Sequence, residues 1–194
     1  MTKGTPDIEK LREDWKQISA EIMSESDRGA ILIGTAYLDD SLHVLLDAVF
    51  VDDKVVLDLL KDGGAFGTFH RRIHLAYGIG LITKKLYNDI EVIRGIRNEL
   101  AHGYGRCSFE TSEIVDKCKR LETCLPAGTT LYGIGLIRAK GCFASAVAFI
   151  SIKLQHQAGL VERATPGRGF KMLERSEWLC RLLFGGNQDD QSQT

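Results

Sequence analysis

The sequence is poor in the features that interrupt helices or cross-link chains. Only three of its 194 residues are proline, so long stretches can form helices without a break. Its five cysteines are an odd number with no CxxC spacing, and no secretory segment precedes them, which argues against a disulfide framework and a zinc site. The most apolar run, residues 141–152, is shorter than the roughly 20 residues that span a membrane. We therefore expect reduced thiols, a cytoplasmic location and no membrane partner.

The charge balance argues against a dedicated duplex-DNA binder. The formal net charge is -1, and there is no basic excess of the kind that dedicated duplex-DNA binders use against phosphates. With 44% hydrophobic and 26% charged residues, the chain is globular rather than intrinsically disordered. Its length suits one domain. We expect a helical bundle over residues 1–158, followed over 159–194 by a basic arm, a short helix and a disordered tail.

Apolar residues recur at helical spacing through most of the chain, and no strand-like alternation is apparent. The pattern predicts an all-α protein, a single bundle of six or seven helices. Several of the starts have candidate caps: Ser24, Ser26 or Asp27 for the second helix, Asp52 or Asp53 for the third, and Thr83 for the fifth. Small residues such as Gly34 on the second helix leave room for a close neighbour. The expected helices cover 7–23, 28–50, 54–61, 68–82, 83–102, 112–122 and 129–157.

The stretch RNELAHGY, residues 97–104, concentrates polar groups where one of these helices ends. The guanidinium of Arg97 is suited to a phosphate, and His102 is placed where it could accept the proton of a ribose 2′-hydroxyl. The same residues also have a purely structural interpretation. Arg97 would then pair with a carboxylate such as Asp39 or Asp40, and His102 would cap carbonyl groups.

A second polar group follows the glycine-rich turn GGAFG, residues 63–67, which does not match a phosphate-binding loop. This group is the cationic cluster of His70, Arg71, Arg72 and His74. It has two interpretations, contact with an RNA backbone or a solvated helix face, and the second is the default.

On the second helix, Asp39 and His43 share one face, with Asp40 beside them. Their spacing permits a metal site, but a polar seam facing Arg94 or Arg97 explains them equally well. We therefore predict no metal and no cofactor.

The spacing of Arg97, His102 and Tyr104, with Asn98 directly after the arginine, resembles the RX4HXY motif of HEPN-domain proteins. The resemblance implies a helical homodimer with a metal-independent endoribonuclease site. In that case Arg97, Asn98 and His102 would form the catalytic set. Tyr104 would match the tyrosine that a partner nucleotidyltransferase antitoxin modifies in some HEPN toxins.

A longer resemblance covers roughly residues 24–125. The segments ESDRGAILIGTAYLDDSLHVLLDAVFVDD, GGAFGTFHRRIHLAYGIGLI and YNDIEVIRGIRNELAHG are similar, in order and spacing, to the mannitol operon repressor (MtlR) family of all-helical regulators. Like that family, the sequence has no helix-turn-helix. The resemblance implies transcriptional repression through a protein partner, such as a phosphotransferase component, or through a surface that binds RNA or DNA. For such a surface the candidate residues are Arg71, Arg72, Arg94, Arg97, His102 and Tyr104.

Overall fold

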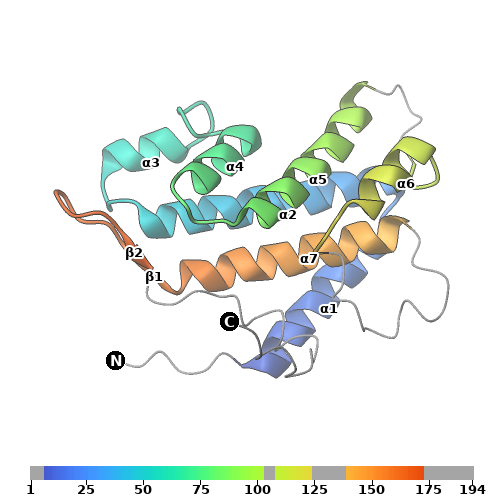
Figure 1. The fold of residues 1–194 in the computed structure, drawn as a ribbon, viewed down its shortest axis with the longest axis horizontal. Helices are drawn as coiled ribbons and strands as arrows, with labels where there is room; N and C mark the ends of the chain where they lie inside the picture. The colour runs from blue at the N-terminus through green and yellow to red at the C-terminus, as the bar shows by residue number, and fades with distance from the viewer. Residues whose placement is uncertain (1–6, 103–107, 124–138, 173–194) are drawn as a thin grey trace, which may run out of the picture.

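The computed structural model describes residues 7–102, 108–123 and 139–172. These residues form seven helices and one two-stranded hairpin (Figure 1). The predicted all-α class is confirmed. The helices are α1 (Ile8–Ser24), α2 (Asp27–Val49), α3 (Lys54–Leu60), α4 (Phe69–Gly78), α5 (Lys84–His102), α6 (Ser112–Lys119) and α7 (Ala139–Ala158).

The helix starts follow the local signals in the sequence. The side-chain oxygen of Ser26 accepts a hydrogen bond from Gly29 N at 3.0 Å, and Asp53 accepts one from Val55 N at 2.8 Å. Thr83 accepts one from Leu86 N at 3.3 Å at the start of α5. Each bond satisfies an N–H group that has no partner inside its helix. The structure therefore selects Ser26 and Asp53 from the predicted candidates and confirms Thr83.

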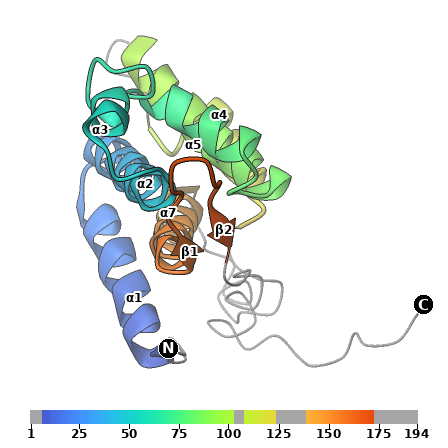
Figure 2. The ribbon, with the colours of Figure 1, turned by 90° about the vertical axis from the view of Figure 1, so that its left-hand side faces the viewer.

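The core is built around α2 and α7, which lie side by side along the molecule (Figure 1). α1 packs on one side of this pair, and α4 and α5 lie on the other (Figure 2). Gly34 permits the close approach of the two central helices, because a Cβ added there would lie 2.7 Å from Cε1 of Phe143 on α7. This confirms the close packing that Gly34 predicts.

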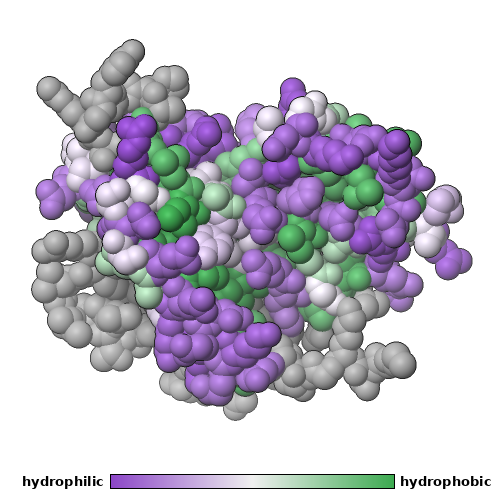
Figure 3. Space-filling model, turned by 180° about the vertical axis from the view of Figure 1, so that it is seen from behind, coloured by the Kyte–Doolittle hydropathy of each residue, from purple (hydrophilic) through white to green (hydrophobic). Residues whose placement is uncertain are grey.

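By length and composition, α2 is the one helix of the described ranges that could cross a membrane, and 50% of its most apolar window is buried inside the fold. Seen from behind, the described surface is largely hydrophilic, with smaller hydrophobic areas between the polar side chains (Figure 3). Burial of α2 in the centre of the bundle thus accounts for its apolar character.

The segment after α7, which the sequence predicts as a basic arm, contains a short β-hairpin. Strands β1 (Val161–Glu162) and β2 (Lys171–Met172) pair in antiparallel register, and Thr165 bridges to Arg168. Ala164 N donates to the carbonyl of Val49 at 2.8 Å, which attaches the hairpin to the end of α2. The two-residue strands are too short to show an alternating pattern, so periodicity did not reveal them. The predicted short helix and tail beyond residue 172 lie outside the described residues.

A tight turn brings α4 against α2 and α5. Gly67, just before the Thr68 cap of α4, packs so closely that an added Cβ would lie 2.1 Å from the carbonyl oxygen of Lys61. Gly63 in the same turn has a φ of 86°, a conformation that glycine adopts without steric cost. The turn predicted from GGAFG is thus confirmed, and it places the first residues of α4 beside the polar end of α5.

Candidate functional site

A surface pocket of about 480 Å³ lies where α2, the start of α4 and the C-terminal half of α5 meet. It gathers residues from three segments that are far apart in the sequence. Among them are Arg94, Arg97 and Asn98, which the sequence singled out. The described lining is Leu32, Thr35, Ala36 and Asp39 from α2, Gly67, Thr68, Phe69 and His70 from the turn and α4, and Arg94, Arg97 and Asn98 from α5.

Arg97 is exposed on the wall of this pocket and makes no hydrogen bond or ion pair with any described residue. The structural interpretation paired it with Asp39 or Asp40, and neither pair forms. Asn98, the next residue, is half-buried and also lines the pocket. The pocket therefore offers one guanidinium whose charge no described carboxylate compensates.

Arg94 differs from Arg97 although it lies one turn away on the same helix. Its Nε and one terminal nitrogen donate to both carboxylate oxygens of Glu91, at 2.8 to 3.1 Å. This hydrogen bonding raises the pKa of Arg94 above its ordinary value, while partial burial opposes the shift. Arg94 therefore forms part of the pocket wall, and the carboxylate of Glu91 compensates the charge of Arg94.

The carboxylate in the pocket wall is also compensated. Oδ1 of Asp39 accepts a hydrogen bond from Arg72 at 2.6 Å, and the other end of the Arg72 guanidinium donates to the Leu60 carbonyl at 2.9 Å. Arg72 is only 6% exposed. Arg72, predicted as a nucleic-acid contact, is thus buried rather than on the surface, because α4 turns this side chain into the protein toward α2 while its neighbour Arg71 faces outward.

Arg71 is exposed on α4 and donates to the carbonyl of Ala65 at 3.3 Å, so it lies against the glycine-rich turn outside the pocket lining. Two other predicted site residues cannot be placed. The side chain of His102 and the whole of Tyr104 lie outside the described residues, although α5 does extend to His102 as predicted.

The expected polar seam on α2 exists, but with a different partner. Asp39, Asp40 and His43 line a second pocket, of about 370 Å³, together with Lys61 and Arg72. The sequence predicted that the seam faces Arg94 or Arg97. Asp39 shares the larger pocket with both arginines, but its ionic partner is Arg72. The turn before α4 brings Arg72 over Asp39, and sequence spacing does not reveal this approach.

The electrostatics of the larger pocket favour an anion. Of its charged described lining residues, Asp39 and Arg94 have ionic partners, which leaves Arg97 as the uncompensated group. The pocket is also lined by Thr68, Phe69 and His70 at the N-terminus of α4, where N–H groups lack helical partners and the helix dipole is positive. A guanidinium and a helix N-terminus that line one pocket can together bind a phosphate or a carboxylate.

The turn residues of this site were missed by the sequence reasoning, which treated Gly67 and Thr68 only as parts of a loop and a helix start. No local signal identifies them, because their role depends on the opposite wall, which α5 supplies.

Comparison with known proteins shows that the part of the chain that forms the pocket matches a known protein family. Residues 21–129 match the MtlR family, described as mannitol repressor. The chain belongs to the mannitol repressor family. Every described residue that lines the larger pocket lies inside the matched range. The predicted family is therefore confirmed, whereas the HEPN motif has no comparable support from these comparisons.

Two curated relatives in the mannitol repressor family are the mannitol operon repressors of Escherichia coli strain K12 and of E. coli O6:H1 strain CFT073. Each is 30% identical over 93 residues, which cover 45% of this chain and 48% of the relative. The chain thus spans about half the length of the curated relatives it matches.

Two solved structures share the fold. A chain from the X-ray structure of the MtlR-HPr complex from E. coli is 22% identical with a TM-score of 0.57, and the match covers 77% of this chain and 98% of that one. The possible transcriptional regulator YggD from Shigella flexneri 2a is 16% identical with a TM-score of 0.56, covering 80% and 98%.

Proposed function

We propose that this protein regulates transcription as a repressor that acts through a protein partner, and that the larger pocket receives an anionic group of that partner. The observation that carries the proposal is the uncompensated Arg97 in a pocket built entirely, in its described lining, from the family-matched region. The named relatives are mannitol operon repressors, which supports a regulatory role.

A protein partner is favoured over direct contact with duplex DNA for two reasons. The formal charge of -1 gives no general attraction for a polyanion. A structurally similar chain was solved in complex with HPr. We propose a partner of the same kind, the predicted phosphotransferase component, for this protein.

The pocket suits an acidic side chain or a phosphoryl group better than a neutral one. A charge-assisted hydrogen bond to Arg97 would be strengthened by the helix N-terminus at Thr68 on the facing wall. Such a bond contributes about 1.5–3 kcal/mol, which corresponds to roughly tenfold to a hundredfold in affinity.

Titration calorimetry with the HPr protein of the same organism tests this proposal. We expect Arg97→Ala to weaken binding at least about tenfold, and Arg97→Lys to recover part of the loss because the charge remains without the planar fork. Arg120→Ala is the matched control, since Arg120 is exposed at the end of α6, away from the pocket lining. Equal affinities for Arg97→Ala and Arg120→Ala would rule out the pocket as the binding site.

The regulatory role has a separate test. A mobility shift on DNA upstream of the protein's own operon, with and without the partner, should show a complex. A transcription reporter under that DNA should then be repressed by the wild-type protein and released by a deletion of its gene. No change in the reporter under any partner condition would contradict repression.

A second candidate is the metal-independent endoribonuclease. The observation that favours it is that Arg97 and Asn98 line a pocket and that Arg97 has no ion pair with a described residue. Incubation with single-stranded RNA in EDTA tests it. Cleavage that leaves 2′,3′-cyclic ends and disappears in both His102→Ala and Arg97→Ala would support this activity, and intact RNA would exclude it. The predicted homodimer is tested on the same samples by sedimentation.

A further inference from the structure

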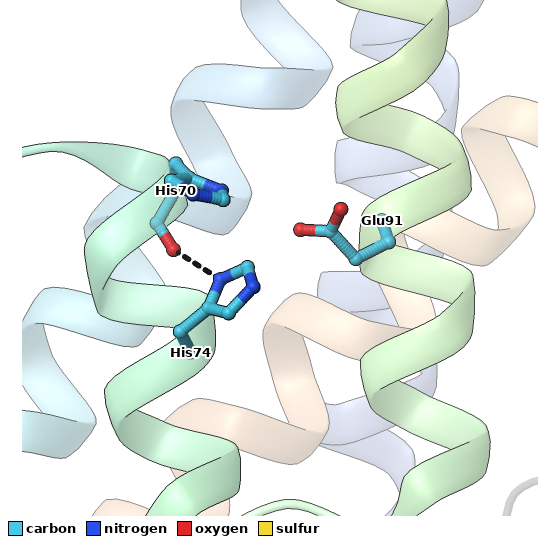
Figure 4. Close-up of side chains that lie close together, drawn as sticks. All are labelled: His70, His74 and Glu91. Atoms are coloured by element: carbon cyan, nitrogen blue, oxygen red, sulfur yellow. Dashed lines mark hydrogen bonds between the residues drawn. The ribbon is translucent and has the colours of Figure 1, made fainter.

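Three side chains with metal-ligand atoms lie together between α4 and α5. His70 and His74 are one turn apart on α4, and Glu91 projects toward them from α5 (Figure 4). One ligand atom from each residue can be chosen so that all three lie within 4.8 Å of one another. Residues four apart share a helix face, so the histidine pair is fixed by the geometry of α4.

The two ring nitrogens of His74 have different hydrogen-bond partners. Nδ1 lies 2.9 Å from the backbone carbonyl oxygen of His70, which can only accept a hydrogen bond. In the neutral ring this bond places the proton on Nδ1 and leaves the lone pair on Nε2. A carbonyl partner on the far nitrogen is the arrangement that orients histidine ligands in metal sites. Nε2 lies 3.2 Å from the hydroxyl of Tyr87, which donates to it and would be released when a cation binds.

Glu91 is also held in place. Both of its oxygens accept hydrogen bonds from Arg94, and its side chain is 22% exposed. Each carboxylate oxygen has more than one lone pair, so the carboxylate can accept from Arg94 and still bind a cation. The positive charges of Arg94 and of Lys84, whose Nζ lies 4.4 Å from the centre of the Tyr87 ring, oppose the cation and limit its affinity.

We propose that His70, His74 and Glu91 form a binding site for a divalent transition-metal cation of the zinc type. Two imidazoles and one carboxylate suit zinc and its neighbours, whereas magnesium and calcium prefer oxygen ligands alone. Three protein ligands leave a coordination position for water or for a group of a bound partner.

The cation would join α4 to α5, the two helices that supply two walls of the larger pocket. His70 belongs to both the pocket and this site, so the ion would lie at the pocket's edge. The cluster of His70, Arg71, Arg72 and His74 does not form a single solvated face, because Arg72 is buried while the other three residues are exposed. Helical rotation instead sends the two histidines toward α5 and Arg72 into the core. The proposal does not depend on the proposed function.

Calorimetric titration of the full chain with zinc chloride tests the site. We expect one zinc per chain, with affinity lowered at least about tenfold in His70→Ala, His74→Ala and Glu91→Gln. His43→Gln is the matched control, since His43 is a half-buried histidine on α2 that lines the other pocket, and it should bind zinc as the wild type does. Magnesium chloride should give no saturable heat. His70 and His74 are exposed, so their alanine variants should fold, which circular dichroism verifies.

A second measurement distinguishes this site from binding at the thiols. The three ligands come from two helices and meet only in the folded chain, so zinc should raise the urea midpoint of the wild type and leave that of His74→Ala unchanged. Undiminished zinc affinity in any of the three ligand variants would overturn the proposal. So would the absence of saturable binding at millimolar zinc.

Discussion

Replacing Asp39 by asparagine should destabilise the protein more than its position in a surface pocket suggests. Asp39 is the ionic partner of Arg72, whose side chain is 8% exposed, and their atoms are 2.6 Å apart. The substitution keeps the size of the side chain and removes its charge. It leaves a buried guanidinium whose remaining close partner is the carbonyl of Leu60.

The size of the loss in unfolding free energy depends on how far the Asp39–Arg72 ion pair is exposed to solvent. Breaking a fully buried ion pair by removing one partner costs about 3–5 kcal/mol, whereas an exposed pair contributes about 0–1 kcal/mol. The Asp39 side chain is 32% exposed, and the fully exposed Asp62 lies 3.9 Å from the same guanidinium and can approach it. We therefore expect the free energy of unfolding to fall by about 2 kcal/mol, an intermediate value.

Urea unfolding at neutral pH, followed by circular dichroism, measures this loss. With a slope near 2 kcal/mol per molar urea, the midpoint of Asp39→Asn should fall by about 1 M. The control is Asp47→Asn, because the Asp47–Arg163 pair has the same chemistry at 3.3 Å but side chains that are 37% and 39% exposed. The control should lose less than about 0.5 kcal/mol. Equal losses in the two variants would refute the role assigned to Arg72 burial.

Three further predictions concern the core and two titrating groups. Gly34→Ala should lower the free energy of unfolding by about 1–3 kcal/mol in the same urea assay, because its Cβ would meet Phe143 at 2.7 Å. The hydrogen bond from Tyr37 to Glu21, aided by burial and the charge of Glu21, raises the pKa of Tyr37 to about 12. The stability that this hydrogen bond contributes is therefore complete below pH 10 and is lost as the pH rises toward 12. Ultraviolet titration should show one late phenolate that is absent in Tyr37→Phe. Burial, and to a lesser extent the nearby Cys142, raises the pKa of Cys118 to about 12. Iodoacetamide at pH 8 should therefore label Cys118 only when urea unfolds the protein. Rapid labelling of Cys118 in the folded protein would contradict this prediction.

The sequence predicted helix positions well where a cap residue and an apolar stripe agree. α2 runs from Asp27 to Val49 against the predicted 28–50, and α3 covers Lys54–Leu60 against 54–61. It was less accurate for α4, which ends at Gly78 rather than at 82. The apolar pattern continues past this end because Leu81 and Ile82 are buried core residues in the turn that follows. An apolar stripe reports burial, and burial does not require a helix.

The candidate site was predicted only in part. Sequence reasoning identified Arg97 and Asn98 because the RX4HXY spacing marks them, and both line the pocket. It could not distinguish Arg71 from Arg72, which are adjacent and chemically alike. One is exposed and the other 6% exposed, because successive residues on a helix point about 100° apart and only the packing of α4 on α2 decides which faces inward.

The amino-acid sequence by itself determined the helical class and the cap candidates, because these depend on residue types at short spacing. It also indicated the family, because several segments keep the family's order and spacing along the chain. Only the tertiary structure decided which charges remain uncompensated. Asp39 pairs with Arg72 and Glu91 with Arg94, whereas Arg97 has no ionic partner among the described residues. Electrostatic compensation acts over a few ångströms in space, and separation along the chain does not specify that distance.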